Sequence, residues 1–403
     1  MSTLEKTQPD VTEPDERPLL PWGRVARVIF AVSAVLGLIG LFMRLTQGHL
    51  PAGYGSYVPW GLWIAVYFHG VGIAAGGFLV YAVAFLFGVR GFERPRGLQI
   101  ASVLVMAIIA PALLAVALDL GHMMRAWRIV LTPGFTSMMA FNTYAYLILI
   151  AIAAVVWFLA RRPESTWLRP VLILGVVVSA MVPSQSGAFF GVVDAKPYWH
   201  SALLPPMLLA GGVTAGAATL LIVRRWLGDE DIFGFKTDRQ RSRDAAGVLR
   251  LVVILGLAVY VLLEFAEYSI TAWSGRIDSP AIELVLFGPY WWVFWIVHLL
   301  FGVIVPLVLL ATRRQRLWLV ASGLVIVTML SSRLNVLVPG QAIGEIEGLQ
   351  DAFFHPRLTY LYQATLMEYL VCFLCLALGM AIFGFGMYVT ARVERRAAER
   401  TPS

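Results

Sequence analysis

Residues 97–121 read GLQIASVLVMAIIAPALLAVALDLG, and this stretch decides the fold class. It contains no charged side chain before Asp119. As a helix that rises about 1.5 Å per residue, it is long enough to cross the roughly 30 Å hydrocarbon core of a lipid bilayer. The stretch therefore predicts a transmembrane helix.

The rest of the chain repeats this pattern. Hydrophobic residues make up 59% of the 403 residues and charged residues only 14%, and the mean hydropathy is +0.77. Such a composition leaves a water-soluble globule too little polar surface to cover itself. We therefore expect an all-α, polytopic integral membrane protein surrounded by the lipid bilayer. About ten transmembrane helices are expected, at roughly 28–46, 59–88, 97–121, 139–160, 168–193, 200–223, 246–272, 288–312, 316–338 and 362–391.

The basic residues indicate how these helices are oriented. Of the 31 Lys and Arg residues, 24 fall on one side of the predicted spans. Cytoplasmic loops are enriched in Lys and Arg, so both termini are expected in the cytoplasm. The chain then divides into an N-terminal tail (1–27), a ten-helix membrane domain (28–391) and a C-terminal tail (392–403). Because the basic residues form short clusters rather than a groove, no nucleic-acid partner is expected.

Cysteine usage restricts the redox chemistry of the chain. Its two cysteines, Cys372 and Cys375, both lie inside an apolar span. They cannot build a disulfide framework or a four-thiolate cluster. We expect no metal site in this chain, and any iron–sulfur cluster must belong to a partner.

Side chains that can hold protons gather toward the predicted outer side. Four histidines fall in or beside outer loops, and two lie about ten residues into helices, which is roughly 15 Å deep. A charge left in hydrocarbon costs at least a few kcal/mol, so such residues are normally paired, turned inward or functional. The histidines are His49, His122, His200, His355, His69 and His298, and the acids in or beside the spans are Asp119, Glu264, Glu267 and Glu368.

The segment Asp119-Leu-Gly-His122-Met-Met-Arg125 ends the third predicted span. Asp119 and His122 are three residues apart, so they share a helix face if the helix continues that far. A carboxylate beside an imidazole suits proton-coupled redox of a quinone, because one group exchanges the proton and the other orients it. We therefore expect Asp119 and His122 to be catalytic, with an interface clamp as the alternative.

Other polar residues in the spans allow two interpretations each. Glu264 and Glu267 could transfer protons or could pair with Arg333 and lock helices together. Gln185, in the polar stretch Pro183-Ser-Gln-Ser-Gly187, could line a pocket or mark a proline kink. His69 could be structural or functional, whereas His298 is expected to be a packed core residue.

Four segments resemble the polysulfide-reductase membrane-subunit family, also called NrfD-like. Within that family, the chain is similar to the ten-helix anchors of hydrogenases, sulfite-reductase-associated complexes and alternative complex III. The resemblance covers most of residues 20–390. Its carriers are the segments Val58-Pro-Trp-Gly-Leu-Trp-Ile64, Asp119 to Trp127, Tyr198-Trp-His-Ser-Ala-Leu-Leu-Pro205 and Phe287-Gly-Pro-Tyr-Trp-Trp292.

The resemblance implies a non-covalently bound menaquinone or ubiquinone near the outer surface, within residues 59–193. It also implies an iron–sulfur, ferredoxin-like electron-transfer subunit and a catalytic subunit on the extracytoplasmic side of a bacterial or archaeal cytoplasmic (inner) membrane. The chain would be the quinone-binding anchor of a respiratory oxidoreductase. The expected quinone-binding residues are Trp60, Trp63, His69, Arg125, Gln185 and His200.

Two other functions compete with this interpretation. A haem b-carrying anchor with two haems would need histidines at both depths, and none lies in the predicted cytoplasmic half, so only a single outer haem is compatible with the sequence. An ion-coupled secondary transporter could use ten spans with Glu264 and Glu267, although no clear internal repeat of interrupted helices is present.

Overall fold

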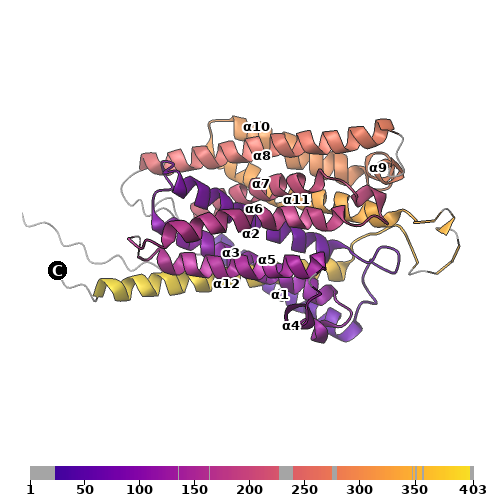
Figure 1. The fold of residues 1–403 in the computed structure, drawn as a ribbon, viewed down its shortest axis with the longest axis horizontal. Helices are drawn as coiled ribbons and strands as arrows, with labels where there is room; N and C mark the ends of the chain where they lie inside the picture. Colours follow the sequence, from indigo (N-terminus) through magenta and orange to yellow (C-terminus); the bar gives the residue numbers. More distant parts are fainter. Residues whose placement is uncertain are drawn as a thin grey trace, which may run out of the picture.

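The computed structural model describes residues 23–134, 136–162, 164–226, 239–274, 279–346, 348–349, 352–355 and 358–399. Over these residues the regular structure is helical, and ten helices are long and apolar enough to cross a membrane, as predicted. Figure 1 shows them running side by side with connections at both ends. They are α1 (Arg24–Gln47), α2 (Leu62–Leu86), α3 (Pro95–Asp119), α5 (Met138–Leu159), α6 (Leu168–Gly191), α7 (Leu204–Trp226), α8 (Arg239–Ser274), the continuous η3 (Val293–Ile304) and α10 (Val305–Ala311), α11 (Gln315–Ala342) and α12 (Leu366–Glu399).

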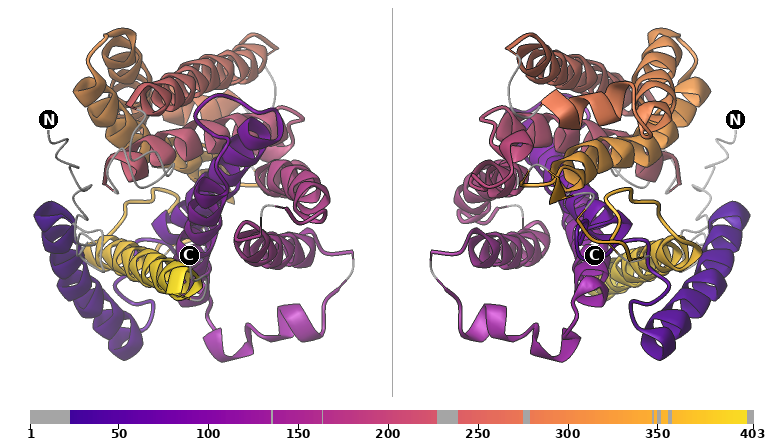
Figure 2. Two further views of the ribbon diagram at one scale, coloured as in Figure 1. Left: turned by 90° about the vertical axis from the view of Figure 1, so that its left-hand side faces the viewer. Right: turned by 90° about the vertical axis from the view of Figure 1, so that its right-hand side faces the viewer.

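The helices pack as two groups that meet where α2 and α6 contact α7 and where α2 contacts α11. Helices α2, α3, α5 and α6 contact one another in a closed ring, and α7 packs against both α8 and α11, with η3 and α10 on α11. Helix α2 contacts α7 and α11 and so joins the two groups. Helix α1 lies at the edge of the molecule beside α12, which packs on α3 (Figure 2). Short helices η1 (Met123–Arg125), α4 (Arg128–Leu131), η2 (Pro197–Trp199) and α9 (Ser279–Leu286) lie in the connections.

Glycines form the seam between α2 and α7. A Cβ atom added at Gly76 would overlap the carbonyl group of Gly212, and one at Gly216 would overlap the backbone of Gly77. Transmembrane helices associate through such close backbone contact because lipid supplies little hydrophobic drive between them. The two glycine-rich strings therefore fix the distance between the two helix groups.

Helix α3 ends at Asp119 and does not continue to His122. Leu120 is extended, and His122 precedes the 3-10 helix η1, so Asp119 and His122 do not share a helix face. Arg44 of α1 secures this end: its Nε donates to the Leu118 carbonyl at 2.7 Å and its Nη2 to the Leu120 carbonyl at 3.2 Å. A guanidinium suits the unpaired carbonyl groups that end a helix. Arg44 thereby stabilises the point at which the chain leaves α3.

The predicted eighth span contains a long π-helical stretch, Val293–Ile304. A π-helix pairs each residue with the fifth one along, so its side chains do not follow the 3.6-residue period of an α-helix. Pro306 follows directly, near the start of α10. This altered register presents His298 to the interior of the second helix group.

Glu368 secures the predicted outer end of the bundle. It is the third residue of α12, and its Oε2 accepts from the backbone N–H groups of Thr365 at 3.0 Å and Gly53 at 2.9 Å. This is the carboxylate half of a capping box, to which the Thr365 hydroxyl also donates at 3.1 Å, and it holds the loop before α2 as well. The Oε1 atom of Glu368 accepts from the Tyr362 hydroxyl at 2.5 Å. The hydroxyl oxygen of Tyr362 in turn accepts from the Leu62 N–H at 2.7 Å. Burial of the phenol is the main cause that raises the pKa of Tyr362, and the neighbouring Glu368 raises it further. Tyr362 therefore keeps its proton and donates a hydrogen bond.

Candidate functional site

A cavity of about 480 Å³ lies within the ring of α2, α3, α5 and α6, at the predicted outer end. The segment with η1 and α4 closes one side of it. Its walls are mainly apolar and aromatic, which is typical of small-molecule sites of this size. The lining residues comprise Trp60, Ile64, Tyr67, Phe68, Leu113, Val116, Ala117, Asp119, Leu120, His122, Arg125, Ala126, Ile129, Met139, Asn142, Thr143, Tyr146 and Phe189.

Three ionisable side chains line the outer part of this cavity. Asp119 ends α3, and its Oδ1 is buried without a hydrogen-bond partner among the described residues. His122 and Arg125 come from the following turn and are exposed. An orphaned carboxylate oxygen facing a cavity is costly unless a ligand or water satisfies it. The chain turn thus brings together the Asp119, His122 and Arg125 that the sequence predicts.

A chain of hydroxyl groups lies deeper in the same cavity. The Tyr67 hydroxyl donates to the Tyr146 hydroxyl at 2.7 Å. Ser186 donates to the Val182 carbonyl, so the 3.4 Å contact between Tyr146 and Ser186 has Tyr146 as donor. The Tyr67 oxygen keeps a free acceptor position. Asn142, on α5, adds a buried side-chain oxygen that has no partner among the described residues.

Trp60 forms a firmly held wall of the cavity. Both of its backbone polar groups bond to the Gln341 side chain: the N–H donates to Oε1 at 3.0 Å, and the carbonyl accepts from Nε2 at 3.1 Å. Its ring stacks on Trp199, with 5.8 Å between centroids and 17° between planes, and also contacts Phe189. Trp60 is therefore pre-positioned and needs no reordering on binding.

Four predicted quinone-binding residues lie outside the cavity lining. The Trp63 indole N–H donates to the Glu368 carbonyl at 3.0 Å, and His69 donates from Nε2 to the Ile326 carbonyl at 2.7 Å. His200 is exposed and lies 3.0 Å from Asp194. Gln185 is on α6, and its Oε1 is buried without a partner among the described residues. Their expected quinone contacts stay predictions.

The acids of α8 bond to residues other than Arg333, the partner that one of their two interpretations gave them. Glu264 accepts from His298 Nε2 at 2.9 Å, and both side chains are buried. Glu267 accepts from the Ser201 hydroxyl at 2.6 Å. Arg333 is buried and donates from Nη2 to the Leu208 carbonyl at 3.3 Å. His298 is a core residue, as expected, but it is also half of a buried polar pair.

Sequence reasoning missed four residues that build the site, Arg44, Tyr67, Asn142 and Tyr146. Arg44 is a basic residue on the side with few of them, and Asn142 is polar within an apolar span. Both features could have marked these residues as candidates for the site, because polar residues in apolar spans are often functional. Tyr67 and Tyr146 come from different helices, and no spacing along the chain connects them.

The described residues contain no group of three or more His, Cys, Asp or Glu side chains placed to hold a metal ion. Cys372 donates to the carbonyl of Glu368 at 3.2 Å, and Cys375 is buried. Both thiols thus have the surroundings expected of core packing.

The ten membrane-spanning helices define a multi-pass membrane protein, and the 480 Å³ cavity lies near one end of the helix bundle. The family model described as "Polysulphide reductase, NrfD" matches residues 52–345. The chain therefore belongs to the polysulphide reductase NrfD family, which confirms the predicted family and the ten-helix membrane fold.

Three relatives match over most of their length. A selenate reductase subunit of Mesobacillus selenatarsenatis is 27% identical, over 85% of this chain and 88% of the relative. The Hdr-like menaquinol oxidoreductase integral membrane subunit of Archaeoglobus fulgidus is 26% identical, over 92% and 94%. A putative dimethyl sulfoxide reductase membrane subunit of Halobacterium salinarum is 26% identical, over 80% of each chain.

Proposed function

We propose that this chain is the membrane anchor of a respiratory oxidoreductase complex and that it exchanges electrons with quinol or quinone in the 480 Å³ cavity. The observation that carries the proposal is the combination of aromatic walls with the orphaned oxygen of Asp119. The relatives from M. selenatarsenatis, A. fulgidus and H. salinarum, named as subunits of reductases or of an oxidoreductase, support an anchor role in electron transfer.

The cavity offers hydrogen-bond acceptors at two depths. Asp119 lies at the outer end of α3, whereas Tyr67 is five residues, or about 7 Å, beyond the outer end of α2. Asn142 adds a second deep acceptor. A quinol carries hydroxyl groups on opposite sides of its ring, so one can donate to Asp119 and the other to Tyr67 or Asn142. The apolar walls suit the ring and its isoprenoid tail.

Asp119 and His122 handle protons in this proposal. Oxidation of one quinol releases two protons and two electrons, and reduction of a quinone takes up the same number. Asp119 accepts a proton from the nearer hydroxyl, and exposed His122 passes protons to the outer aqueous phase. Arg125 adds positive charge beside the developing negative oxygen. Because the reaction is reversible at each group, the arrangement serves both directions of electron flow.

The electrons require an acceptor or donor on the same side of the membrane. We propose an extracytoplasmic iron–sulfur subunit that docks on the loops beside the cavity and connects it to a catalytic subunit. The cavity lies at the end of the bundle that the charge distribution assigns to the outside. Menaquinone is the proposed substrate, because the A. fulgidus relative is named a menaquinol oxidoreductase.

The test compares Asp119→Asn and His122→Ala with the control Glu345→Gln in the purified complex. General acid–base groups contribute about 10²- to 10⁴-fold, so each cavity variant should lower quinone-linked turnover roughly 100-fold or more. The control should retain turnover, because Glu345 is 55% exposed and pairs with Lys196 outside the cavity. Co-purification of the partner subunits should be unchanged in all three.

Two outcomes would contradict the proposal. Turnover by Asp119→Asn equal to that of the control would reject the cavity as the redox site. Loss of partner subunits from the Asp119 or His122 variants would instead support the interface clamp. A reduced-minus-oxidised spectrum of the purified chain addresses the competing haem anchor, and a haem absorption band would support that alternative.

We further propose that Glu264 exchanges a proton with His298, with Glu267 as a second proton-transfer group nearer the outer end of α8. The support is the buried 2.9 Å contact between Glu264 and His298, with the Tyr260 hydroxyl 3.4 Å from Glu264. Glu264→Gln in proteoliposomes should reduce proton release per quinol while leaving turnover with an artificial electron acceptor within about twofold. Unchanged proton release would remove Glu264 from the proton route.

A further inference from the structure

A second cavity, of about 610 Å³, lies at the opposite end of the molecule from the proposed redox site. It is formed where the ends of α7 and α8 meet the turn between α10 and α11. Three arginines and a glutamine line it, together with Leu221, Ala246, Leu317, Trp318 and Leu319, and no described lining residue is acidic. This end is the one that the basic residues assign to the cytoplasm.

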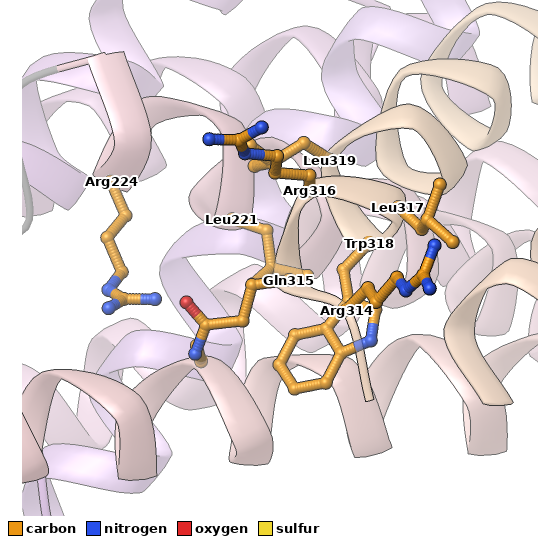
Figure 3. A pocket seen from close by; sticks show the side chains of 9 residues that line it. Leu221, Arg224, Arg314, Gln315, Arg316, Leu317, Trp318 and Leu319 are labelled. Atoms are coloured by element: carbon orange, nitrogen blue, oxygen red, sulfur yellow. The ribbon is translucent and has the colours of Figure 1, made fainter. Parts of the chain in front are cut away.

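The arginines reach the cavity from different elements. Arg224, on α7, is 4% exposed, whereas Arg314 and Arg316 flank the start of α11 and are exposed. In Figure 3 the side chains of Arg224 and Gln315 extend into the same part of the cavity. Arg314 lies beside the Trp318 ring, and the Arg316 side chain extends away from both of these places. The cavity therefore combines one buried and two accessible guanidinium groups, which bind phosphate oxygens in a planar, two-bond geometry.

The start of α11 adds a second source of positive potential. Arg314 is its N-cap and makes no side-chain capping bond, and the first turn contains no acidic residue. The backbone N–H groups of this turn therefore have no side-chain acceptor at the cap, and they carry the positive end of the helix dipole. An anion in the cavity would interact with both the arginines and this helix end.

The position of the cavity indicates where the anion comes from. Trp318 donates its indole N–H to the Thr312 carbonyl at 2.8 Å and lies under Arg250, 5.1 Å from the ring centre. Tryptophan and arginine gather at the level of lipid headgroups. Large apolar side chains are exposed close by in sequence, Val320 on α11 and Leu251 on α8. A headgroup in the cavity can thus keep its acyl chains along the apolar outer surface of these helices.

We propose that this cavity binds the phosphate headgroup of an anionic phospholipid from the cytoplasmic leaflet. Basic pockets between transmembrane helices on that side suit such lipids. The proposal does not rest on the quinone assignment, because none of these residues lines the redox cavity.

The test uses the full-length chain in detergent, stripped of lipid and then supplied with dioleoylphosphatidylglycerol or dioleoylphosphatidylcholine. Native mass spectrometry counts the retained lipid. Arg314→Gln with Arg316→Gln should lower phosphatidylglycerol retention about tenfold or more, since each basic residue near the surface contributes several-fold. Arg314→Lys with Arg316→Lys should keep most of it, because lysine still binds phosphate as a point charge.

The matched control is Arg395→Gln with Arg396→Gln, which removes two exposed charges at the same end but on α12. It should change retention less than about twofold. An equal loss in this control would overturn the proposal in favour of a general charge effect. Equal retention of phosphatidylcholine would overturn it, and so would displacement of the lipid by an equal concentration of inorganic phosphate, which would indicate a free-anion site.

Discussion

Replacement of Glu368 should destabilise the protein far more than replacement of any exposed acid. Its side chain is fully buried and accepts hydrogen bonds from the Thr365 and Gly53 N–H groups and from the Tyr362 hydroxyl. Glu368→Ala leaves these three donors without an acceptor, in a space too enclosed for full hydration. Each buried donor that loses its partner costs about 1–3 kcal/mol. Because the bonds are not additive, we expect a loss of about 4 kcal/mol in free energy of unfolding.

Glu368→Gln separates charge from geometry. The amide keeps one acceptor oxygen, which can still serve the Thr365 and Gly53 N–H groups, but its NH₂ group cannot accept from Tyr362. Hydrogen bonds to a charged acceptor contribute about 1.5–3 kcal/mol, roughly twice as much as neutral ones. The expected loss is therefore about 2 kcal/mol, between wild type and Glu368→Ala.

The measurement is equilibrium unfolding of the detergent-solubilised chain by titration with a denaturing detergent, followed by tryptophan fluorescence. The control is Glu345→Ala at the same end, where the side chain is 55% exposed and forms a 3.3 Å ion pair with Lys196. Exposed pairs contribute about 0–1 kcal/mol. If Glu368→Ala lost no more stability than Glu345→Ala, the capping box would not hold this end of the bundle.

Three further predictions concern packing and pH. Gly76→Ala should destabilise the protein by about 1–3 kcal/mol, because the added methyl group overpacks against α7. Gly323→Ala should be neutral or slightly stabilising, because the space around Gly323 is open. Equal effects of the two variants in unfolding titrations would refute the close glycine contact between α2 and α7. Glu264→Leu and His298→Phe should each lower the free energy of unfolding by about 3 kcal/mol, because each leaves the other polar group buried without its partner. The double variant should lose less than the sum of the two single losses, and additive losses would refute the pairing. Since burial raises the pKa of Tyr362 above 10.0, its contribution to stability is complete below about pH 10 and is lost as the pH rises further; Tyr362→Phe should weaken this alkaline dependence, and an unchanged pH profile would contradict it.

The sequence predicts the ten spans well because each depends only on local hydropathy and length. All ten expected spans correspond to helices of the described residues. The family resemblance is also confirmed, since the matching segments lie within one continuous family match. What the sequence cannot predict is which face of each helix meets which neighbour.

Trp60 and Trp63 illustrate this limit. Both belong to one short motif, yet α2 begins only at Leu62, so Trp60 lies in the preceding loop and lines the cavity while Trp63 turns toward α12. The start of the helix depends on Tyr362 and Glu368, about 300 residues further along the chain. No local pattern carries that information.

The pair Glu264 and His298 illustrates a second limit. Helical periodicity assumes 3.6 residues per turn, but His298 lies in a π-helical stretch where that period fails. The sequence left Glu264 with two interpretations, proton transfer or an ion pair with Arg333, and did not point to His298. Asp119, His122 and Arg125 line the same cavity because they are close along the chain and remain close even though the helix ends at Asp119. Their catalytic and quinone-binding roles stay predictions.

The contact between Glu368 and the loop before α2 joins the last membrane span to the second. During synthesis, the ribosome has made almost the entire chain before Glu368 can leave the translocation channel. Until then the Gly53 and Leu62 N–H groups have neither the Glu368 carboxylate nor the Tyr362 hydroxyl to bind, although Gln341 of α11 can already hold Trp60. The contacts that hold the loop before α2 at Gly53 and Leu62 must therefore form after the final helix has been inserted, and a chain truncated before Glu368 would lack them.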